Sequence, residues 1–211
     1  MCIRDSSEAC FWHTTGEAVL TAPVGGWLQP MAAGGHAESP ESKRRMRNLM
    51  DRSGLLSQLV QRDADPASAD EIGAVHDAGY LAEFKALSDK RGGILGISAP
   101  FGHGSFEIAC QSAGLAREAL LSVLRGEYDT AYALTRPPGH HCLADSAMGF
   151  CLLANIPIAI AAARAAGLAE RFFILDWDVH HGHGSQAIFY EDPDVHTCLL
   201  YTSPSPRDSN L

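Results

Sequence analysis

The alternation of apolar and polar segments along the chain predicts an α/β fold in which parallel strands alternate with helices. Short apolar runs suited to buried strands cover residues 130–135 and 172–175, and an Ala-rich helical segment that ends near Gly167 lies between them. A strand, a helix and a second strand in this order predict a right-handed parallel crossover. We therefore expect both strands to end at the same edge of one sheet.

Apolar residues spaced three or four apart predict further helices over residues 40–51, 70–87 and 106–124, the second of which reads as one helix or two. Ser39 suits the N-cap of the first helix, with Pro40 at its first helical position, and Ser105 suits the cap of the third. Residues 11–35 and 92–104 are rich in glycine without periodicity, so we expect irregular structure in the first and a long loop in the second.

Ionisable side chains gather directly after the second strand. Asp176, Asp178 and His180 alternate along the chain, and an extended backbone would place all three on one face. In open α/β sheets ligands bind beyond the carboxyl ends of the strands. A carboxylate and an imidazole are suitable ligands for zinc, and a catalytic zinc needs three protein ligands and one open position. The third ligand would have to come from elsewhere in the protein.

A second cluster follows the strand at residues 130–135. There Arg136-Pro137-Pro138-Gly139 leads into the adjacent His140 and His141. Two prolines and a glycine restrict the backbone, so we expect the two imidazoles on a stiff turn. Side chains that transfer protons need this kind of preorganisation, and the pair is a candidate for acid–base chemistry.

Composition narrows the classes of function. The chain has 211 residues, of which 46% are hydrophobic, enough for one domain with a substantial core. Its formal net charge of −9 argues against a nucleic-acid partner and favours a cationic substrate. No apolar run approaches the roughly 18 residues of a membrane span. The six cysteines form no CxxC pair, which favours a reducing compartment, and we expect a cytoplasmic protein.

The two ends of the chain differ from the rest. Arg4-Asp5-Ser6 recurs as Arg207-Asp208-Ser209, inside a Ser/Pro-rich terminal segment without periodicity. Both ends resemble translated sequencing-adapter sequence, which has no part in a fold. We predict that residues 7–197 are the N-terminal portion of a single domain, and that residues 1–6 and 198–211 are non-native tails.

Taken together, three motifs resemble the histone deacetylase family, particularly its bacterial class II-like members and the acetylpolyamine amidohydrolases. They are Arg136-Pro-Pro-Gly-His-His141, Gly149-Phe150-Cys151 and Asp176-Trp-Asp-Val-His-His-Gly-His-Gly-Ser-Gln186. The resemblance extends to residues 36–41, Val75-His76 and Tyr80, and so spans roughly residues 11–197. It implies a three-layer arginase/deacetylase α/β fold with a central parallel sheet, of which the C-terminal part is missing here. It also implies zinc-dependent hydrolysis of an acetyl-amide to acetate and a free amine.

The resemblance also implies roles for individual residues. Asp178 and His180 match two of three zinc ligands, and backbone carbonyls of Asp176, Asp178 and His180 match those that hold a structural potassium ion. His140 and His141 match the tandem histidines that handle protons. Asp176 matches the carboxylate that orients the first of them.

The resemblance also implies a substrate channel, and the sequence differs from the family pattern in two respects. Gly149 and Phe150 match residues that line the substrate channel. His183 stands where the family has Asp or Asn beside the second tandem histidine. The third zinc ligand and the oxyanion-stabilising Tyr or His lie further along the family chain than Thr197. We therefore predict that the parent gene encodes a deacetylase and that this chain is inactive or nearly so.

Two other readings remain open. The sheet and the Asp/His cluster suit another metallohydrolase of the arginase-like fold, although that reading does not account for residues 136–141. The chain also suits a non-catalytic metal-binding or interaction protein that keeps the scaffold, and both His183 and the missing ligands favour this alternative. A third reading, in which every histidine is structural, would require two such clusters to assemble by chance.

Overall fold

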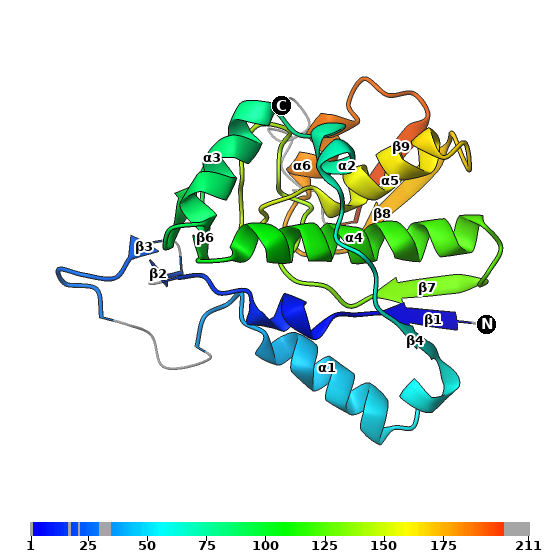
Figure 1. The fold of residues 1–211 in the computed structure, drawn as a ribbon, viewed down its shortest axis with the longest axis horizontal. Coiled ribbons are helices and arrows are strands. Elements are labelled where there is room, and N and C mark those ends of the chain that lie inside the picture. The colour runs from blue at the N-terminus through cyan, green and yellow to red at the C-terminus, as the bar shows by residue number, and fades with distance from the viewer. Residues whose placement is uncertain (1, 17, 21, 30–34, 201–211) are drawn as a thin grey trace.

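The computed structural model describes residues 2–16, 18–20, 22–29 and 35–200 (Figure 1). Its helices are α1 (Glu41–Arg52), α2 (Ala69–Gly73), α3 (Ala78–Ser88), α4 (Ser105–Leu124), α5 (Asn155–Ala165) and α6 (His183–Ile188), with 3-10 turns η1 (Glu8–Trp12) and η2 (Leu56–Gln58). Its strands are β1 (Cys2–Asp5), β2 (Ala18–Val19), β3 (Ala22–Pro23), β4 (Val60–Arg62), β5 (Gly92–Leu95), β6 (Ala99–Gly102), β7 (Thr130–Ala133), β8 (Phe172–Asp176) and β9 (Val195–Leu199). No helix in these ranges is both long and apolar enough to cross a membrane.

The strands form two parallel sheets and two small hairpins. One sheet has the order β4-β1-β7 and the other pairs β8 with β9, whereas β2–β3 and β5–β6 are antiparallel. Among the described residues, β7 and β8 belong to different sheets. The prediction that both strands lie in one hydrogen-bonded sheet is therefore wrong for this part of the chain. The chain between β7 and β8 includes a long segment, residues 134–154, ahead of α5. This length allows it to join strands that are not neighbours in a sheet.

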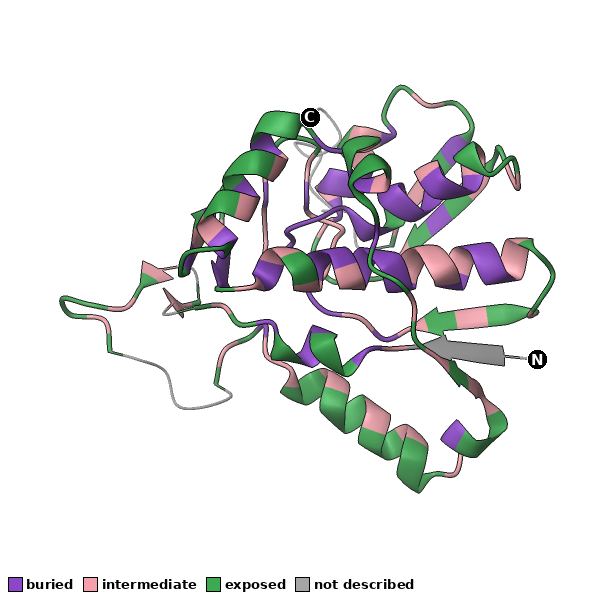
Figure 2. Cartoon of the chain, in the orientation of Figure 1, coloured by how far each residue is buried: buried purple, intermediate pink, exposed green. Residues whose placement is uncertain are grey.

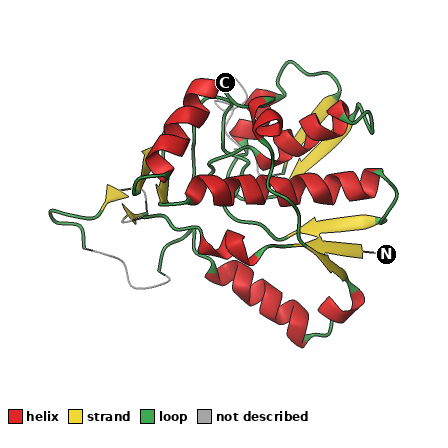
Figure 3. Ribbon diagram, viewed as in Figure 1, coloured by secondary structure: helices red, strands yellow, loops and turns green. Residues whose placement is uncertain are grey.

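Helix α4 is the central element of the molecule. Figure 1 shows it crossing the middle, with β1, β7 and α1 on one side and α5, β8 and β9 on the other. It packs against α5, β7 and β1. Its buried face carries small residues, among them Ser112, Ala113 and Gly114. A Cβ added at Gly114 would lie 2.2 Å from the carbonyl oxygen of Asp65, so glycine is needed for this close approach. The helices and strands that surround α4 are distinguished in Figure 3.

The buried residues form three clusters (Figure 2). The largest cluster lies between the helices α2, α3, α4 and α5 on one side and the β5–β6 hairpin on the other. It includes Phe84, Phe101 and Ile158. A second, around Cys10, Phe11, Leu115 and Leu134, joins the N-terminal segment to α4. The third contains Ile160, Ile174, Phe189 and Val195 and packs one face of β8 and β9 against α5 and the end of α6.

The helix predictions hold with corrections at their starts. Residues 70–87 form two helices, α2 and α3, and Ser68 begins α2 with a reciprocal capping box to Glu71. Helix α1 begins one residue later than expected, with Pro40 at the N-cap position and no side-chain cap. Ser105 is the first residue of α4 and not its cap, because Gly104 occupies the cap position in a left-handed conformation.

The prediction of a long loop over residues 92–104 is wrong, because most of this segment forms the β5–β6 hairpin. Its glycines allow two backbones to approach each other. A Cβ at Gly92, where φ is +82°, would lie 2.0 Å from the carbonyl oxygen of Phe101. Residues 2–5 form the backbone of β1 between β4 and β7, and residues 201–211 of the second predicted tail lie outside the described residues. The non-native origin of both ends stays a prediction.

Candidate active site

The turn after β7 holds the tandem histidines against α4 and α5. The carbonyl oxygen of Pro137 accepts hydrogen bonds from Ser112 Oγ at 2.9 Å and from Asn155 Nδ2 at 3.2 Å. A Cβ at Gly139 would lie 2.6 Å from the backbone nitrogen of Asn155, so the turn lies directly against the start of α5. The backbone that carries His140 is therefore braced by two helices.

The two predicted clusters meet at the pair formed by His140 and Asp176. His140 Nδ1 lies 2.9 Å from Asp176 Oδ2, and their side chains are only 16% and 13% exposed. Asp176 is the last residue of β8, whereas His140 follows β7. The structure thus joins the carboxyl ends of two strands that are not in one sheet. A carboxylate at this distance orients the imidazole and favours the tautomer that carries a proton on Nδ1.

His141 lies beside His140 with the two rings tilted by 38°, and one of its ring nitrogens lacks a partner within the described ranges. The ring centroids of the two imidazoles are 3.9 Å apart, and the His141 backbone N–H donates to Cys151 Sγ at 3.4 Å. Its Nδ1 is buried and has no hydrogen-bond partner among the residues that the structure describes. Burial, followed by the nearby imidazoles of His140, His183 and His180, lowers the pKa of His141 to about 4. This imidazole is neutral near pH 7.

His183 does not supply the missing partner. Its ring centroid lies 4.8 Å from that of His141, but its Nδ1 bonds to the carbonyl oxygen of His181 at 2.9 Å. Its Nε2 contacts the sulfur of Met148. His141 Nδ1 therefore stays without a partner among the described residues.

Asp178 and His180 form an exposed pair beside the histidines. Asp178 Oδ1 accepts from the His180 backbone N–H at 2.8 Å and lies 3.1 Å from His180 Nδ1. Burial opposes the shift, but hydrogen bonds from His180 and the nearby His140 hold the pKa of Asp178 below its usual value. The side chains of His180 and Asp178 are 75% and 49% exposed, so both are open to a ligand.

The backbone in this loop is not extended, and the expectation of one continuous face from Asp176 to His180 is wrong. The strand ends at Asp176, whose Oδ1 accepts the backbone N–H of Asp178 at 3.0 Å. Each aspartate thus captures the N–H two residues further on, which turns the chain. Side-chain hydrogen bonding overrides the period-two pattern.

The Asp178–His180 pair fits part of a zinc site. A carboxylate oxygen and an imidazole nitrogen 3.1 Å apart match the ligand types and the close spacing that zinc requires. Within the ranges that the structure describes, no group of three or more His, Cys, Asp or Glu side chains gathers in a way that could hold a metal ion. The described chain therefore offers two ligands where a catalytic zinc needs three.

Of the two residues predicted to line a channel, Gly149 lies against His141 and Phe150 contacts His36. The backbone N–H groups of Phe150 and Gly149 donate to the carbonyl oxygens of Ser98 and Ile97, at 2.9 and 3.0 Å, which ties them to the β5–β6 hairpin. A Cβ at Gly149 would lie 2.3 Å from His141 Cδ2. The Phe150 ring meets the ring of His36 edge-on, with 5.4 Å between centroids.

His76 and Tyr80, which the family resemblance also covers, brace the segment that follows Phe150. The Tyr80 hydroxyl donates to the carbonyl oxygen of Leu152 at 2.6 Å, and His76 Nε2 accepts from the backbone N–H of Ala154 at 2.9 Å. Burial lowers the pKa of His76 and raises that of Tyr80. Their contacts assign them a supporting role for the loop.

Sequence reasoning missed a buried ion pair between Arg136 and Glu38. Arg136 Nε and an Nη atom donate to the two carboxylate oxygens of Glu38 at 2.7 and 2.6 Å, and both side chains are almost fully buried. A further Nη donates to the carbonyl oxygen of His13 at 2.6 Å. The pair anchors the start of the histidine turn to the N-terminal segment. No local pattern signals it, since 98 positions separate the partners.

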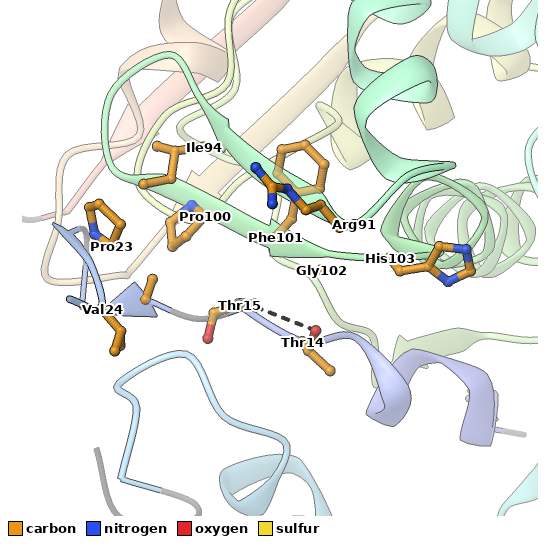
Figure 4. Close-up of a pocket in the computed structure, with 13 residues that line it drawn as sticks. Thr14, Thr15, Pro23, Val24, Arg91, Ile94, Pro100, Phe101, Gly102 and His103 are labelled. Atoms are coloured by element: carbon orange, nitrogen blue, oxygen red, sulfur yellow. Dashed lines mark hydrogen bonds between the residues drawn. The ribbon is translucent and has the colours of Figure 1, made fainter. Parts of the chain in front are cut away.

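A cavity of about 550 Å³ lies elsewhere, between residues 14–24 and the β5–β6 hairpin (Figure 4). Arg91 and His103 are its ionisable lining residues, and within its wall the Gly16 backbone N–H donates to Thr14 Oγ1. None of the candidate catalytic, substrate-binding or metal-binding residues lines it. Concavity alone does not mark the candidate site in this chain.

Comparison with known proteins connects the site to a family. The model of the histone deacetylase domain matches residues 36–209. The histone deacetylase-like amidohydrolase of Pseudomonas aeruginosa is 59% identical over 194 residues, which cover 92% of this chain and 51% of the relative. The human polyamine deacetylase HDAC10 is 34% identical over 169 residues, covering 75% of this chain and 24% of the relative.

A solved structure agrees with these sequence matches. The crystal structure of the HDA15 HD domain superposes with a TM-score of 0.81 at 27% sequence identity, covering 94% of this chain and 52% of that one. The chain spans about half the length of this domain and of the Pseudomonas relative. The matched domain model and the Pseudomonas relative show that this chain belongs to the histone deacetylase family.

Proposed function

We propose that the whole protein is a zinc-dependent deacetylase that hydrolyses an acetyl-amide of the acetyl-lysine or acetylpolyamine type to acetate and a free amine. The observation that carries the proposal is the His140–Asp176 pair, with 2.9 Å between Nδ1 and Oδ2, beside the exposed Asp178 and His180. Membership in the histone deacetylase family supports amide hydrolysis as the reaction class.

Asp178 and His180 are the residues of this chain that would hold the zinc ion. When bound, zinc polarises the acyl carbonyl and lowers the pKa of its water toward about 7. Backbone carbonyls of Asp176, Asp178 and His180 would serve a structural potassium ion. The Asp176 carbonyl already accepts the Leu200 N–H at 2.8 Å and keeps a second lone pair for such a role.

His140 is the residue best arranged to move a proton. With Nδ1–H donated to Asp176, its Nε2 carries the lone pair and accepts a proton from the attacking water. The negative charge of Asp176 stabilises the imidazolium that results. His141 lies beside His140 and is neutral, because burial holds its pKa at about 4. It could therefore form a hydrogen bond with the amide group of the substrate. The His140 imidazolium would then return the proton taken from water to the leaving nitrogen, since an amide anion is a poor leaving group.

The 211-residue chain itself is proposed to be inactive or nearly so. It contributes two predicted metal ligands, and no third ligand gathers with them in the described ranges. Loss of a single oxyanion donor typically costs about 100- to 1,000-fold in rate, and a missing ligand also weakens metal binding.

The proposed substrate is a cationic acetylated amine, free or within a protein. The net charge of −9 favours such a substrate and disfavours nucleic acid. The human relative is a polyamine deacetylase, and a Caenorhabditis elegans relative that is 35% identical over 170 residues is histone deacetylase 6. We further propose a cytoplasmic protein without a membrane partner.

A non-catalytic metal-binding protein is the second candidate function. The buried, unpartnered Nδ1 of His141 favours it, because an imidazole without an orienting acceptor is less well prepared for proton transfer.

Zinc content and deacetylation, measured on the 211-residue chain and on the longer gene product, test both candidates. Deacetylation of an acetyl-lysine peptide or of N-acetylputrescine by the longer product, lost in its His140→Gln variant, supports the enzyme. Zinc in the longer product without activity towards either substrate overturns it and supports the binding protein.

A further inference from the structure

Gly182 is a buried residue just ahead of helix α6, and its backbone conformation does not explain why it is glycine. Its angles, φ −77° and ψ 58°, lie in the inverse γ-turn region, which residues with side chains also adopt. Glycine is needed where φ is positive or where another group approaches the backbone closely. Because φ is negative here, we looked for a group that approaches Gly182.

The group that approaches Gly182 is the carboxylate of Asp176. A Cβ on Gly182 would lie 2.2 Å from Asp176 Oδ2 and 3.2 Å from His140 Nδ1. These two atoms form the 2.9 Å hydrogen bond of the candidate site. Glycine carries only a hydrogen atom at this point, and so it leaves the pair the space that it occupies.

The loop that carries Gly182 is fixed to the turn that carries His140. The backbone N–H of Ser185 donates to the carbonyl oxygen of His140 at 3.1 Å. A Cβ on Gly184 would lie 2.4 Å from the carbonyl oxygen of Cys142, so the two backbones are already in contact. The loop therefore has little room to retreat from a methyl group on Gly182.

The carboxylate has to move instead, and the displacement falls on one of its oxygens. Asp176 Oδ1 accepts the backbone N–H of Asp178 at 3.0 Å, whereas Oδ2 is the atom next to Gly182. Non-bonded carbon and oxygen atoms repel strongly inside about 3 Å, so a methyl group would push Oδ2 away by about 1 Å.

This displacement would weaken the hydrogen bond between His140 and Asp176. The three distances place the added Cβ beside the bond, so the shift lengthens it from 2.9 Å to about 3.3 Å and bends it. An N–H···O bond is normally no longer than about 3.2 Å. The carboxylate would then orient the imidazole less well.

We infer that Gly182 is a positioning residue for the His140–Asp176 pair, because the space that it leaves beside Oδ2 keeps the carboxylate where it orients the imidazole. The inference rests on the proposed function, in which Asp176 holds the proton of His140 on Nδ1 and leaves Nε2 free to accept one from water. A side chain at position 182 would loosen that orientation.

The tautomer of His140 tests the inference. Nitrogen NMR shifts of its two ring nitrogens show which one carries the proton, in the metal-free 211-residue chain and in mildly alkaline solution where imidazole is neutral. We expect the proton on Nδ1 in the native chain and a mixture of both tautomers in Gly182→Ala. Gly73→Ala in α2 is the matched control, because nothing lies within 4 Å of its added Cβ. A proton that stays on Nδ1 in Gly182→Ala overturns the inference.

A double-mutant cycle separates positioning from a general loss of stability. Asp176→Ala removes the carboxylate and makes room for the methyl group, so the fall in the urea midpoint that Gly182→Ala causes should shrink by at least half in this background. Equal falls in both backgrounds would place the strain elsewhere and refute the role of Gly182. If Gly182→Ala alone does not fold, recovery of the fold in the double variant supports the inference, and its absence there, with Asp176→Ala folded, refutes it.

Gly184 supplies a contrast within the same loop. The three nearest neighbours of its added Cβ would be backbone atoms of His141 and Cys142, at 2.4 to 2.7 Å. Gly184→Ala should therefore lower the urea midpoint equally with and without Asp176→Ala. Relief of both glycine variants by Asp176→Ala would mean that the whole loop loosens, and it would rule out a specific role for Gly182.

The same NMR signal separates failure of this inference from failure of the proposed function. A native chain whose His140 carries its proton on Nε2 overturns the proposed role of the pair, and the inference with it. A native Nδ1 proton that Gly182→Ala leaves in place overturns the inference alone. Neither experiment depends on hydrolysis.

Discussion

Replacement of Glu38 by glutamine should destabilise the chain strongly, because it removes the carboxylate that pairs with the buried guanidinium of Arg136. Arg136 is 1% exposed, and both oxygens of Glu38 accept its N–H groups at 2.7 and 2.6 Å. Glutamine preserves the shape but supplies one acceptor and no charge. Breaking a buried ion pair from one side typically costs about 3–5 kcal/mol. Because the isosteric side chain keeps one hydrogen bond, we expect a loss near 3 kcal/mol at the lower end of that range.

Urea denaturation followed by circular dichroism measures this loss. With a slope of about 1–3 kcal/mol per molar urea, the midpoint should fall by about 1–3 M. Glu41→Gln is the matched control, since Glu41 makes a 3.4 Å ion pair with Arg44 in which the side chains are 55% and 42% exposed. Exposed pairs contribute at most about 1 kcal/mol, and so its midpoint should hardly move.

Equal midpoints for Glu38→Gln and Glu41→Gln would refute the reasoning, because burial is the only difference on which it depends. A second variant separates charge from packing. Glu38→Leu combined with Arg136→Met removes both charges while keeping apolar volume. It should recover part of the lost stability, since replacing a complete buried pair by apolar residues is often neutral or favourable, but the His13 carbonyl loses its Arg136 donor.

Further predictions concern the imidazoles. His183→Asp should raise the pKa of His141 above its value of about 4, because a carboxylate beside the ring favours the charged form; an unchanged pKa in an NMR titration would contradict this. Burial lowers the pKa of His13 to about 3, as it lowers that of His141 to about 4, so both bind protons more weakly in the folded chain than in the unfolded one. The free energy of unfolding should therefore fall as pH drops from about 6.5 towards 4. Urea midpoints across this range measure the loss, and His141→Gln should make it smaller by removing one of the two contributions. Gly149→Ala, which adds a Cβ 2.3 Å from the His141 ring at a φ of +53°, should destabilise the fold more than Gly73→Ala in the same assay.

Local sequence determined much of what the structure contains. The helical spacing of apolar residues located α1 to α5 to within a few residues, since it follows directly from which face each helix buries. The two ionisable clusters were likewise predictable, because prolines, glycines and strand ends fix where a chain turns. Three motifs in one order were also sufficient to predict the family, which the matched domain model shows. All of these signals lie within short stretches of the chain.

Only the tertiary structure decided which of these stretches meet. His140 reaches Asp176 although β7 and β8 lie in different sheets, and Arg136 pairs with Glu38 across 98 positions. The β5–β6 hairpin replaces an expected loop because two glycine-rich segments pair with each other. For the two pairs the deciding quantity is a distance between groups remote in sequence, and for the hairpin it is how closely two backbones approach. Local periodicity carries no information about such distances, because burial, backbone approach and charge pairing depend on the packed neighbours.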